Sequence, residues 1–168
     1  MSSGSKFKDT SLRQAKEHLI REGDTDIFPK LFEIDAIVSE WDIIEDELMK
    51  RPVGSYKWVG GRRAIIPKGK YSFRVATQLD PIDTLVLTAL IFEYGSNLED
   101  MRMSVEENVV FSYRFSPDSG LLYDAETDWY RRFWSKSLEK ARDSNYVVMT
   151  DVTDYYNQIY HHVVENQL

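Results

Sequence analysis

The stretch RRAIIPKGKYSFRVATQL, residues 62–79, constrains the fold more than any other part of the sequence. Runs rich in β-branched and aromatic residues lie on both sides of Pro67-Lys68-Gly69-Lys70, which is a turn-forming sequence. Two such runs around a short turn predict an antiparallel β-hairpin. We therefore expect a β-ribbon that carries lysines at its tip.

A helix is predicted directly after this hairpin, with its start at Asp80-Pro81. Aspartate is a preferred N-cap residue, and proline fits the first helical position because its missing N–H needs no partner there. The apolar residues that follow recur at helical spacing as far as about Gly95, namely Ile82, Leu85, Val86, Ala89 and Leu90.

The remaining segments continue this mixture of helices and strands without an internal repeat. Their order of helices, hairpin, helix, strand, helix, strand and helix predicts an α+β fold. The predicted helices span residues 9–22, residues 32–50 as one helix or a pair, residues 125–142, and the segment from about Thr153; the predicted strands span residues 108–115 and 146–152.

The composition bounds the class of protein. A chain of 168 residues with 42% hydrophobic and 13% aromatic content can bury the core of one domain. It has no cysteine, which excludes disulfides and thiolate chemistry. No stretch approaches the roughly 18 apolar residues of a membrane span, and the N-terminus lacks an apolar secretory signal. These features predict a cytoplasmic protein that does not enter a membrane.

The charge is distributed unevenly. The net charge of -7 argues against a general nucleic-acid binder, which is usually basic. Residues 22–47, however, contain ten acids and one lysine, whereas residues 51–79 contain no acid. The basic segment either attracts polyanions or docks onto the acidic segment. Its seven bases are Arg51, Lys57, Arg62, Arg63, Lys68, Lys70 and Arg74.

The hairpin tip is a candidate phosphate site. Lys68 and Lys70 lie at the predicted turn, and Arg74 lies on the returning strand. Arginine binds phosphate through a planar fork of N–H donors, while lysine acts as a point charge, so this set suits a triphosphate. The alternative is an ordinary solvated turn, where lysines are common.

Asp151 is a candidate metal ligand. It ends the predicted strand over residues 146–152, where a carboxylate and the main-chain oxygen of Val152 could bind a hard cation such as Mg²⁺. The alternative is that Asp151 or Asp154 caps the helix predicted from Thr153. Both readings are compatible with the residues.

Tyr156 follows Asp151 by five residues. A tyrosine ring there could lie over a bound sugar and collide with a 2′-hydroxyl, which would favour deoxyribose. The alternative is that Tyr155 and Tyr156 are ordinary core and rim aromatics. A pair of tyrosines by itself does not separate these two interpretations.

Taken in order, these motifs resemble the N-terminal half of bacterial reverse transcriptases of the retron-like and phage-defence-associated group. In that family a strand ends in aspartate and is followed by an acidic and aromatic motif, here Asp151 and then Asp154-Tyr155-Tyr156, with Ile159-Tyr160-His161-His162 after it. Upstream, IPKGKYSFRVATQLDPIDTLVLTAL resembles the fingers hairpin and its following helix. The resemblance covers roughly residues 60–168.

The resemblance implies a fold and a set of residue roles. Residues 1–50 lie outside the resemblance and are predicted to form a helical N-terminal segment, whereas residues 51–168 would form the fingers and the start of the palm of a right-hand polymerase. The activity would be RNA-directed DNA polymerisation by two-metal phosphoryl transfer with Mg²⁺, on an RNA template with a DNA or RNA primer and deoxynucleoside triphosphates, in antiviral defence. Asp151 would be catalytic and would bind metal with Val152, Tyr156 would be the sugar gate, and the nucleotide would contact Lys68, Lys70, Arg74, Asp154, Tyr155 and Tyr156.

One motif of that family does not occur among these 168 residues: the second metal-binding turn, Tyr/Phe-x-Asp-Asp. We therefore expect this chain to be inactive alone, as a segment truncated after the first metal-binding motif that needs a C-terminal part or a partner chain. The alternative is a non-catalytic nucleic-acid-binding or regulatory remnant of such an enzyme. A third possibility is an unrelated α+β domain.

Overall fold

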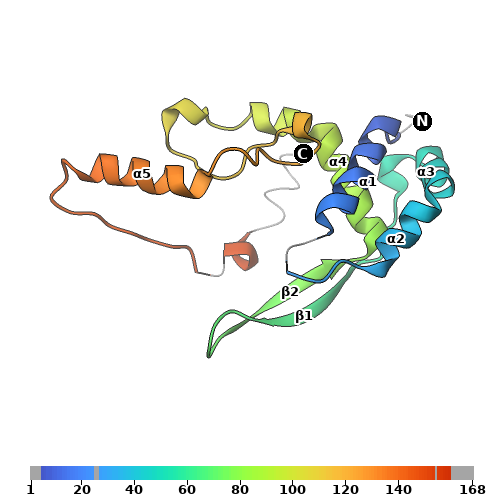
Figure 1. Ribbon diagram of the computed structural model, residues 1–168, viewed down its shortest axis with the longest axis horizontal. Coiled ribbons are helices and arrows are strands. Elements are labelled where there is room, and N and C mark those ends of the chain that lie inside the picture. Colours follow the sequence, from blue (N-terminus) through green and yellow to red (C-terminus); the bar gives the residue numbers. More distant parts are fainter. Residues whose placement is uncertain (1–4, 25–26, 154, 160–168) are drawn as a thin grey trace. The chain divides into compact units, whose positions relative to one another are not determined.

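The computed structural model describes residues 5–24, 27–153 and 155–159 (Figure 1). Within these residues the chain has an α+β fold with five α-helices and one two-stranded antiparallel sheet. It divides into two compact units, Met1–Trp129 and Tyr130–Leu168, and each unit is described by itself. No helix in the described ranges is long and apolar enough to cross a membrane.

Helices α1 (Asp9–Glu22) and α4 (Pro81–Asp100) pack along each other and form the centre of the first unit (Figure 1). The prediction of a helix over residues 9–22 is confirmed. The residue that follows the helix is Gly23, whose backbone φ of +78° is one that glycine adopts without strain. Its N–H donates a hydrogen bond to the Leu19 carbonyl at 3.0 Å and caps the helix.

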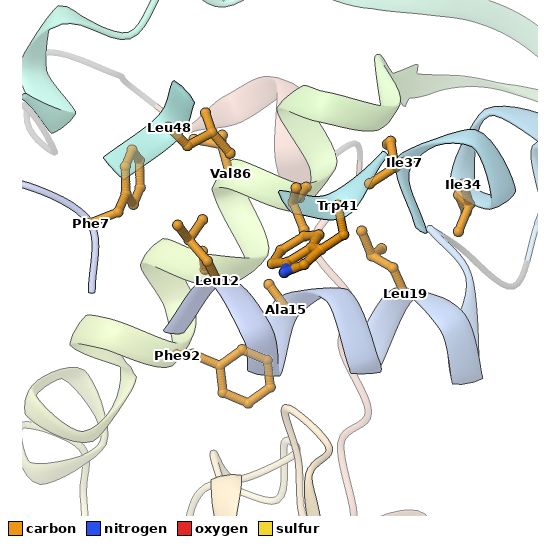
Figure 2. Packing of buried hydrophobic residues seen from close by; sticks show 12 residues of the cluster. Phe7, Leu12, Ala15, Leu19, Ile34, Ile37, Trp41, Leu48, Val86 and Phe92 are labelled. Atoms are coloured by element: carbon orange, nitrogen blue, oxygen red, sulfur yellow. The ribbon is translucent and has the colours of Figure 1, made fainter. Parts of the chain in front are cut away.

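The core of the first unit lies where α1, α4 and two short helices meet, α2 (Phe32–Ser39) and α3 (Trp41–Lys50). Trp41 of α3 reaches toward α1 close to Ala15 (Figure 2). The segment predicted as one helix or a pair is thus a pair, separated at Glu40. The buried core side chains are Phe7, Leu12, Ala15, Leu19, Ile34, Ile37, Trp41, Leu48, Leu85, Val86, Ala89 and Phe92.

Helix α4 begins as predicted. Asp80 Oδ1 accepts a hydrogen bond from the Ile82 N–H at 3.0 Å, and Pro81 is the first helical residue. The helix does not stop near Gly95, however, and continues to Asp100. Gly95 serves packing instead, because a Cβ there would lie 2.7 Å from the ring of Phe115.

The predicted hairpin is also present. Strands β1 (Gly61–Pro67) and β2 (Phe73–Leu79) are antiparallel, with Ile66 opposite Arg74 and Pro67 opposite Phe73. The turn is closed by the Lys68 N–H, which donates to the Ser72 carbonyl at 2.9 Å. The ribbon projects away from the helices of its unit (Figure 1).

The strand predicted over residues 108–115 is not formed. Side chains near the end of α4 form hydrogen bonds with backbone groups of this segment, which are then not free to pair with a neighbouring strand. The Phe115 N–H donates to Glu99 Oε2 at 3.0 Å, and Arg102 Nη1 donates to the Tyr113 carbonyl at 2.7 Å. The buried Arg114 donates to Glu99 Oε1 at 2.6 Å and fixes the segment as a loop.

Helix α5 (Trp129–Ala141), which belongs to the second unit apart from its first residue, begins four residues later than the predicted helix over 125–142. Asp124 accounts for the delay, since its Oδ1 accepts the Glu126 N–H at 3.0 Å and holds a turn there. A 3₁₀ turn, Tyr155–Gln158, lies where a helix was predicted from about Thr153.

The strand predicted over residues 146–152 is not formed either, and the prediction that Asp151 ends a buried strand is wrong for this structure. The segment is extended and exposed, with Tyr146 and Val148 more than four-fifths accessible. A strand needs a neighbour for its backbone groups. The two strands among the described residues pair only with each other, so no further sheet accompanies the hairpin there.

The packing of α1 predicts the effect of Leu12→Ala. Leu12 is fully buried, so the change should lower the free energy of unfolding by about 2–5 kcal/mol through lost burial and a residual cavity. Urea unfolding followed by circular dichroism measures it. Leu98→Ala on the exposed side of α4 is the control, with a change within about 0.5 kcal/mol. Equal effects of the two substitutions would contradict this account of the core.

Candidate functional site

The hairpin presents three free cations. Lys68, Lys70 and Arg74 are exposed, and none of them forms an ion pair with any residue in the described part of the chain. Lys70 Nζ lies 5.3 Å from the centroid of the Tyr71 ring. The structure therefore places all three predicted phosphate ligands on one ribbon with their charges unneutralised.

The acidic segment neutralises little of the basic one. Arg51 pairs with Glu47 at 3.4 Å and Arg62 with Glu33 at 3.6 Å, both at exposed positions. Within the described ranges no ion pair involves the other five bases of residues 51–79. Docking of the basic segment onto the acidic one is thus supported by only these two ion pairs among the described residues, and exposed ion pairs contribute little stability. The five remaining cations are Lys57, Arg63, Lys68, Lys70 and Arg74.

One face of the ribbon carries exposed apolar side chains near the tip. The register puts Ile65 opposite Val75 and Pro67 opposite Phe73 on this face, and all four residues are exposed. Ile65 is 71% accessible and Phe73 66%. Apolar and aromatic groups among cations are the surface chemistry that stacks on bases while attracting phosphates.

Asp83 fixes the base of the ribbon. It is fully buried in the first turn of α4, and its Oδ1 accepts a hydrogen bond from the Tyr56 hydroxyl at 2.7 Å. Its Oδ2 accepts the N–H groups of Val59 at 2.9 Å and Gly60 at 3.0 Å. Burial, together with the hydrogen bond to Asp83, raises the pKa of Tyr56 far above its usual range, so this hydroxyl stays protonated.

The two aspartates of the Asp80-Pro81-Ile82-Asp83 motif therefore act on the two ends of the hairpin. Asp83 holds the chain just before β1, and Asp80 caps α4 directly after β2. In the sequence, Asp83 lies in the first turn of the helix predicted from Asp80-Pro81. Its helical spacing from Val86 and Leu90, three and seven residues on, was a signal that it belongs to the apolar face.

Asp151 and its neighbours belong to the second unit. Asp151 is exposed in an extended stretch, and Val152 is 60% accessible. Asp151 accepts no hydrogen bond from the described residues; since Asp154 is not among them, the helix-cap alternative stays a prediction. Tyr155 is exposed in the 3₁₀ turn that also contains the backbone of Tyr156, and Asp154 lies outside the described residues.

The predicted site residues thus form two sets. The structure brings Lys68, Lys70 and Arg74 together on the hairpin of the first unit, and Asp151, Val152 and Tyr155 are close in sequence in the second. In the described ranges no cluster of three or more histidine, aspartate or glutamate side chains could hold a metal ion. Each set is accessible to a ligand.

No protein family model matches this chain, and no curated protein or solved structure is significantly similar to it. The function is accordingly inferred from the residues of this chain and their geometry. The hairpin, its anchor at Asp83 and the exposed Asp151 segment are the features that carry the inference.

The Asp83 anchor generates a prediction. Asp83→Ala should lower the free energy of unfolding by about 3 kcal/mol, because three partly buried hydrogen bonds lose their common acceptor at once. Tyr56→Phe should cost about 1 kcal/mol, since it removes one of these bonds. Chemical denaturation measures both. Asp100→Ala, an exposed acid at the other end of α4, is the control, and an equally small effect of Asp83→Ala would refute the anchor.

Proposed function

We propose that this chain is the fingers and the start of the palm of an RNA-directed DNA polymerase, a reverse transcriptase of the retron-like, phage-defence-associated type. It would work in the cytoplasm on an RNA template with a DNA or RNA primer. The observation that carries the proposal is the exposed basic hairpin whose ends are fixed to α4 by Asp80 and Asp83.

The hairpin chemistry suits an incoming deoxynucleoside triphosphate. Arg74 can bind one phosphate group through two parallel N–H donors, while Lys68 and Lys70 supply point charges nearby. Because none of the three has an acidic partner among the described residues, a triphosphate would not have to displace one. The Asp83 anchor keeps the base of the ribbon in place.

The donor atoms at Asp151 suit magnesium. An accessible carboxylate and the adjacent main-chain oxygen of Val152 are hard oxygen ligands, and Mg²⁺ commonly takes one or two protein carboxylates together with substrate phosphates. Asp151 and Val152 would hold the ion on this basis. When bound, it supplies positive charge to the phosphoryl group that is transferred.

Two-metal catalysis needs more carboxylates than Asp151 offers. Reverse transcriptases supply them from a Tyr/Phe-x-Asp-Asp turn, which these 168 residues do not contain. We therefore propose that polymerisation requires further protein, either in the same reading frame or in a partner chain. In such a palm the exposed apolar run at residues 146–149 would pair with neighbouring strands, which would explain its β-forming composition.

A non-catalytic role in nucleic-acid binding is the second candidate. It is favoured by the unpaired cations and the exposed apolar face of the ribbon, which need no metal to bind a polyanion. Binding of single-stranded RNA would then weaken as salt rises and would not respond to Mg²⁺. Dependence of binding on Mg²⁺ would favour the polymerase proposal.

Asp151→Ala tests the metal assignment. In the product of the complete reading frame that contains this chain, the substitution should reduce primer extension on an RNA template by about a thousandfold or more, because metal-ion stabilisation contributes several kcal/mol to phosphoryl transfer. Asp143→Ala, an exposed acid in the same unit, should leave extension near wild type. Activity of Asp151→Ala close to that of the control would remove Asp151 from catalysis.

Tyr156→Ala tests the sugar gate. Removal of the ring should raise incorporation of ribonucleotides relative to deoxyribonucleotides, because the group that would collide with the 2′-hydroxyl is gone. Single-nucleotide extension with matched ribo- and deoxyribonucleoside triphosphates measures the ratio. Tyr146→Ala, at an exposed tyrosine earlier in the unit, is the control. An unchanged ratio in Tyr156→Ala would rule out this role.

A further inference from the structure

Trp58 is an exposed tryptophan at the base of the hairpin, shortly before β1 begins at Gly61. It is 50% accessible, although the large apolar ring of tryptophan is highly buried on average in folded proteins. Exposure of a single apolar residue is common and needs no ligand to explain it. The case for a ligand therefore depends on how the ring is held and on the charges around it.

The Trp58 ring is held by neighbours that are themselves fixed. The rings of Tyr56 and Trp58 meet edge to face, with their centroids 5.0 Å apart and 82° between their planes. In this arrangement Tyr56 covers at most one face of the indole. The Tyr56 hydroxyl donates to Asp83, and the same carboxylate accepts the N–H of Val59, the residue after the tryptophan. These bonds position an exposed aromatic ring in advance, so a ligand need not order it.

The charge around Trp58 is positive. Lys57 precedes it, and Arg62 and Arg63 follow in β1, all at exposed positions. Lys57 and Arg63 form no ion pair with the described part of the chain, and the pair formed by Arg62 is a long surface contact of 3.6 Å. Residues 51–79 contain no acid. The surroundings of the ring therefore attract an anionic ligand.

The ribbon continues this chemistry toward its tip. The register places Arg63 on the same face as Ile65 and Phe73, because alternate side chains of a strand share a face. At the turn, Tyr71 is exposed and the Lys70 Nζ lies 5.3 Å from its ring centroid. Aromatic rings and cations without acidic partners thus occur together at the base and at the tip of the ribbon.

We propose that Trp58 stacks on an unpaired base of a single-stranded RNA whose phosphates contact Lys57, Arg62 and Arg63. Every base has a π-face, so this contact does not depend on the sequence of the strand. The inference rests on the proposed function and deepens it. It assigns the base of the hairpin to a single strand, whereas the tip is assigned to the triphosphate.

Other partners fit these observations less well. A duplex keeps its bases paired and stacked, so it would contact the cations and leave the indole face without a base. An apolar protein surface would cover the ring but would bury the neighbouring cations without partners, which is costly. A single strand supplies both an aromatic face and phosphates, and it therefore satisfies the ring and the cations together.

Two labelled strands of about 15 nucleotides provide a matched pair of probes: an oligouridine and an abasic strand with the same sugar-phosphate backbone. They have equal numbers of phosphates and differ only in the bases. Fluorescence anisotropy at low salt with the whole 168-residue chain should show tighter binding of the oligouridine by about fivefold or more, since at least one base stacks on the protein.

Trp58→Leu should weaken binding of the oligouridine about fivefold to a hundredfold and leave the affinity for the abasic strand unchanged, because leucine is apolar but has no aromatic face. Trp58→Phe should retain most of the affinity, since its ring still stacks. Tyr94→Leu, which removes an exposed ring from the second half of α4, is the control and should bind both strands like wild type.

Equal affinity of the wild-type chain for the two strands would overturn the inference, and this comparison does not depend on whether any variant folds. Unchanged binding of the oligouridine by Trp58→Leu would also overturn it. Failure of both strands to bind would do the same and would leave a protein as the partner of this surface. The polymerase function is decided separately by primer extension with Asp151→Ala, so the two proposals can fail independently.

Discussion

The hydrogen bonds of one buried carboxylate determine how the exposed part of this protein is presented. Asp83 joins the first turn of α4 to the loop before β1, and these bonds replace the water that the carboxylate would otherwise keep. Without this acceptor only the end of β2, which runs directly into α4, would tie the hairpin to the helices. The core of α1, α2, α3 and α4 therefore supports a projecting ribbon through a polar contact and not through apolar packing alone.

The elements that were predicted well are those whose signals are local. The hairpin follows from alternating β-forming residues around Pro67 and Gly69, and the start of α4 follows from Asp80-Pro81, whose cap is formed by neighbouring atoms. The candidate phosphate ligands were found for the same reason, since a turn exposes its lysines in almost any fold. Their lack of acidic partners was not predictable, because it depends on where distant acids lie.

The strand predictions that were wrong share one physical cause, because whether a segment forms a strand depends on hydrogen-bond partners that lie far away in the sequence. Residues 108–115 have strand composition, but Glu99 and Arg102 bind the backbone groups of Phe115 and Tyr113, and the Arg114 side chain donates to Glu99. Residues 146–152 have strand composition and no partner strand among the described residues. The role of Asp83 is not visible in a linear pattern either, since tertiary packing decides it.

The two-stranded ribbon has a further consequence for how the protein behaves in solution. Both of its outer edges carry backbone groups that no third strand pairs with in the described structure, beside exposed Ile65, Phe73 and Val75. Such edges promote aggregation unless charge keeps them apart. The arginines and lysines of the ribbon thus act as gatekeepers against edge-to-edge assembly. A bound polyanion would neutralise these charges and so remove the repulsion between ribbons. It would at the same time cover the exposed strand edges through which the ribbons would associate.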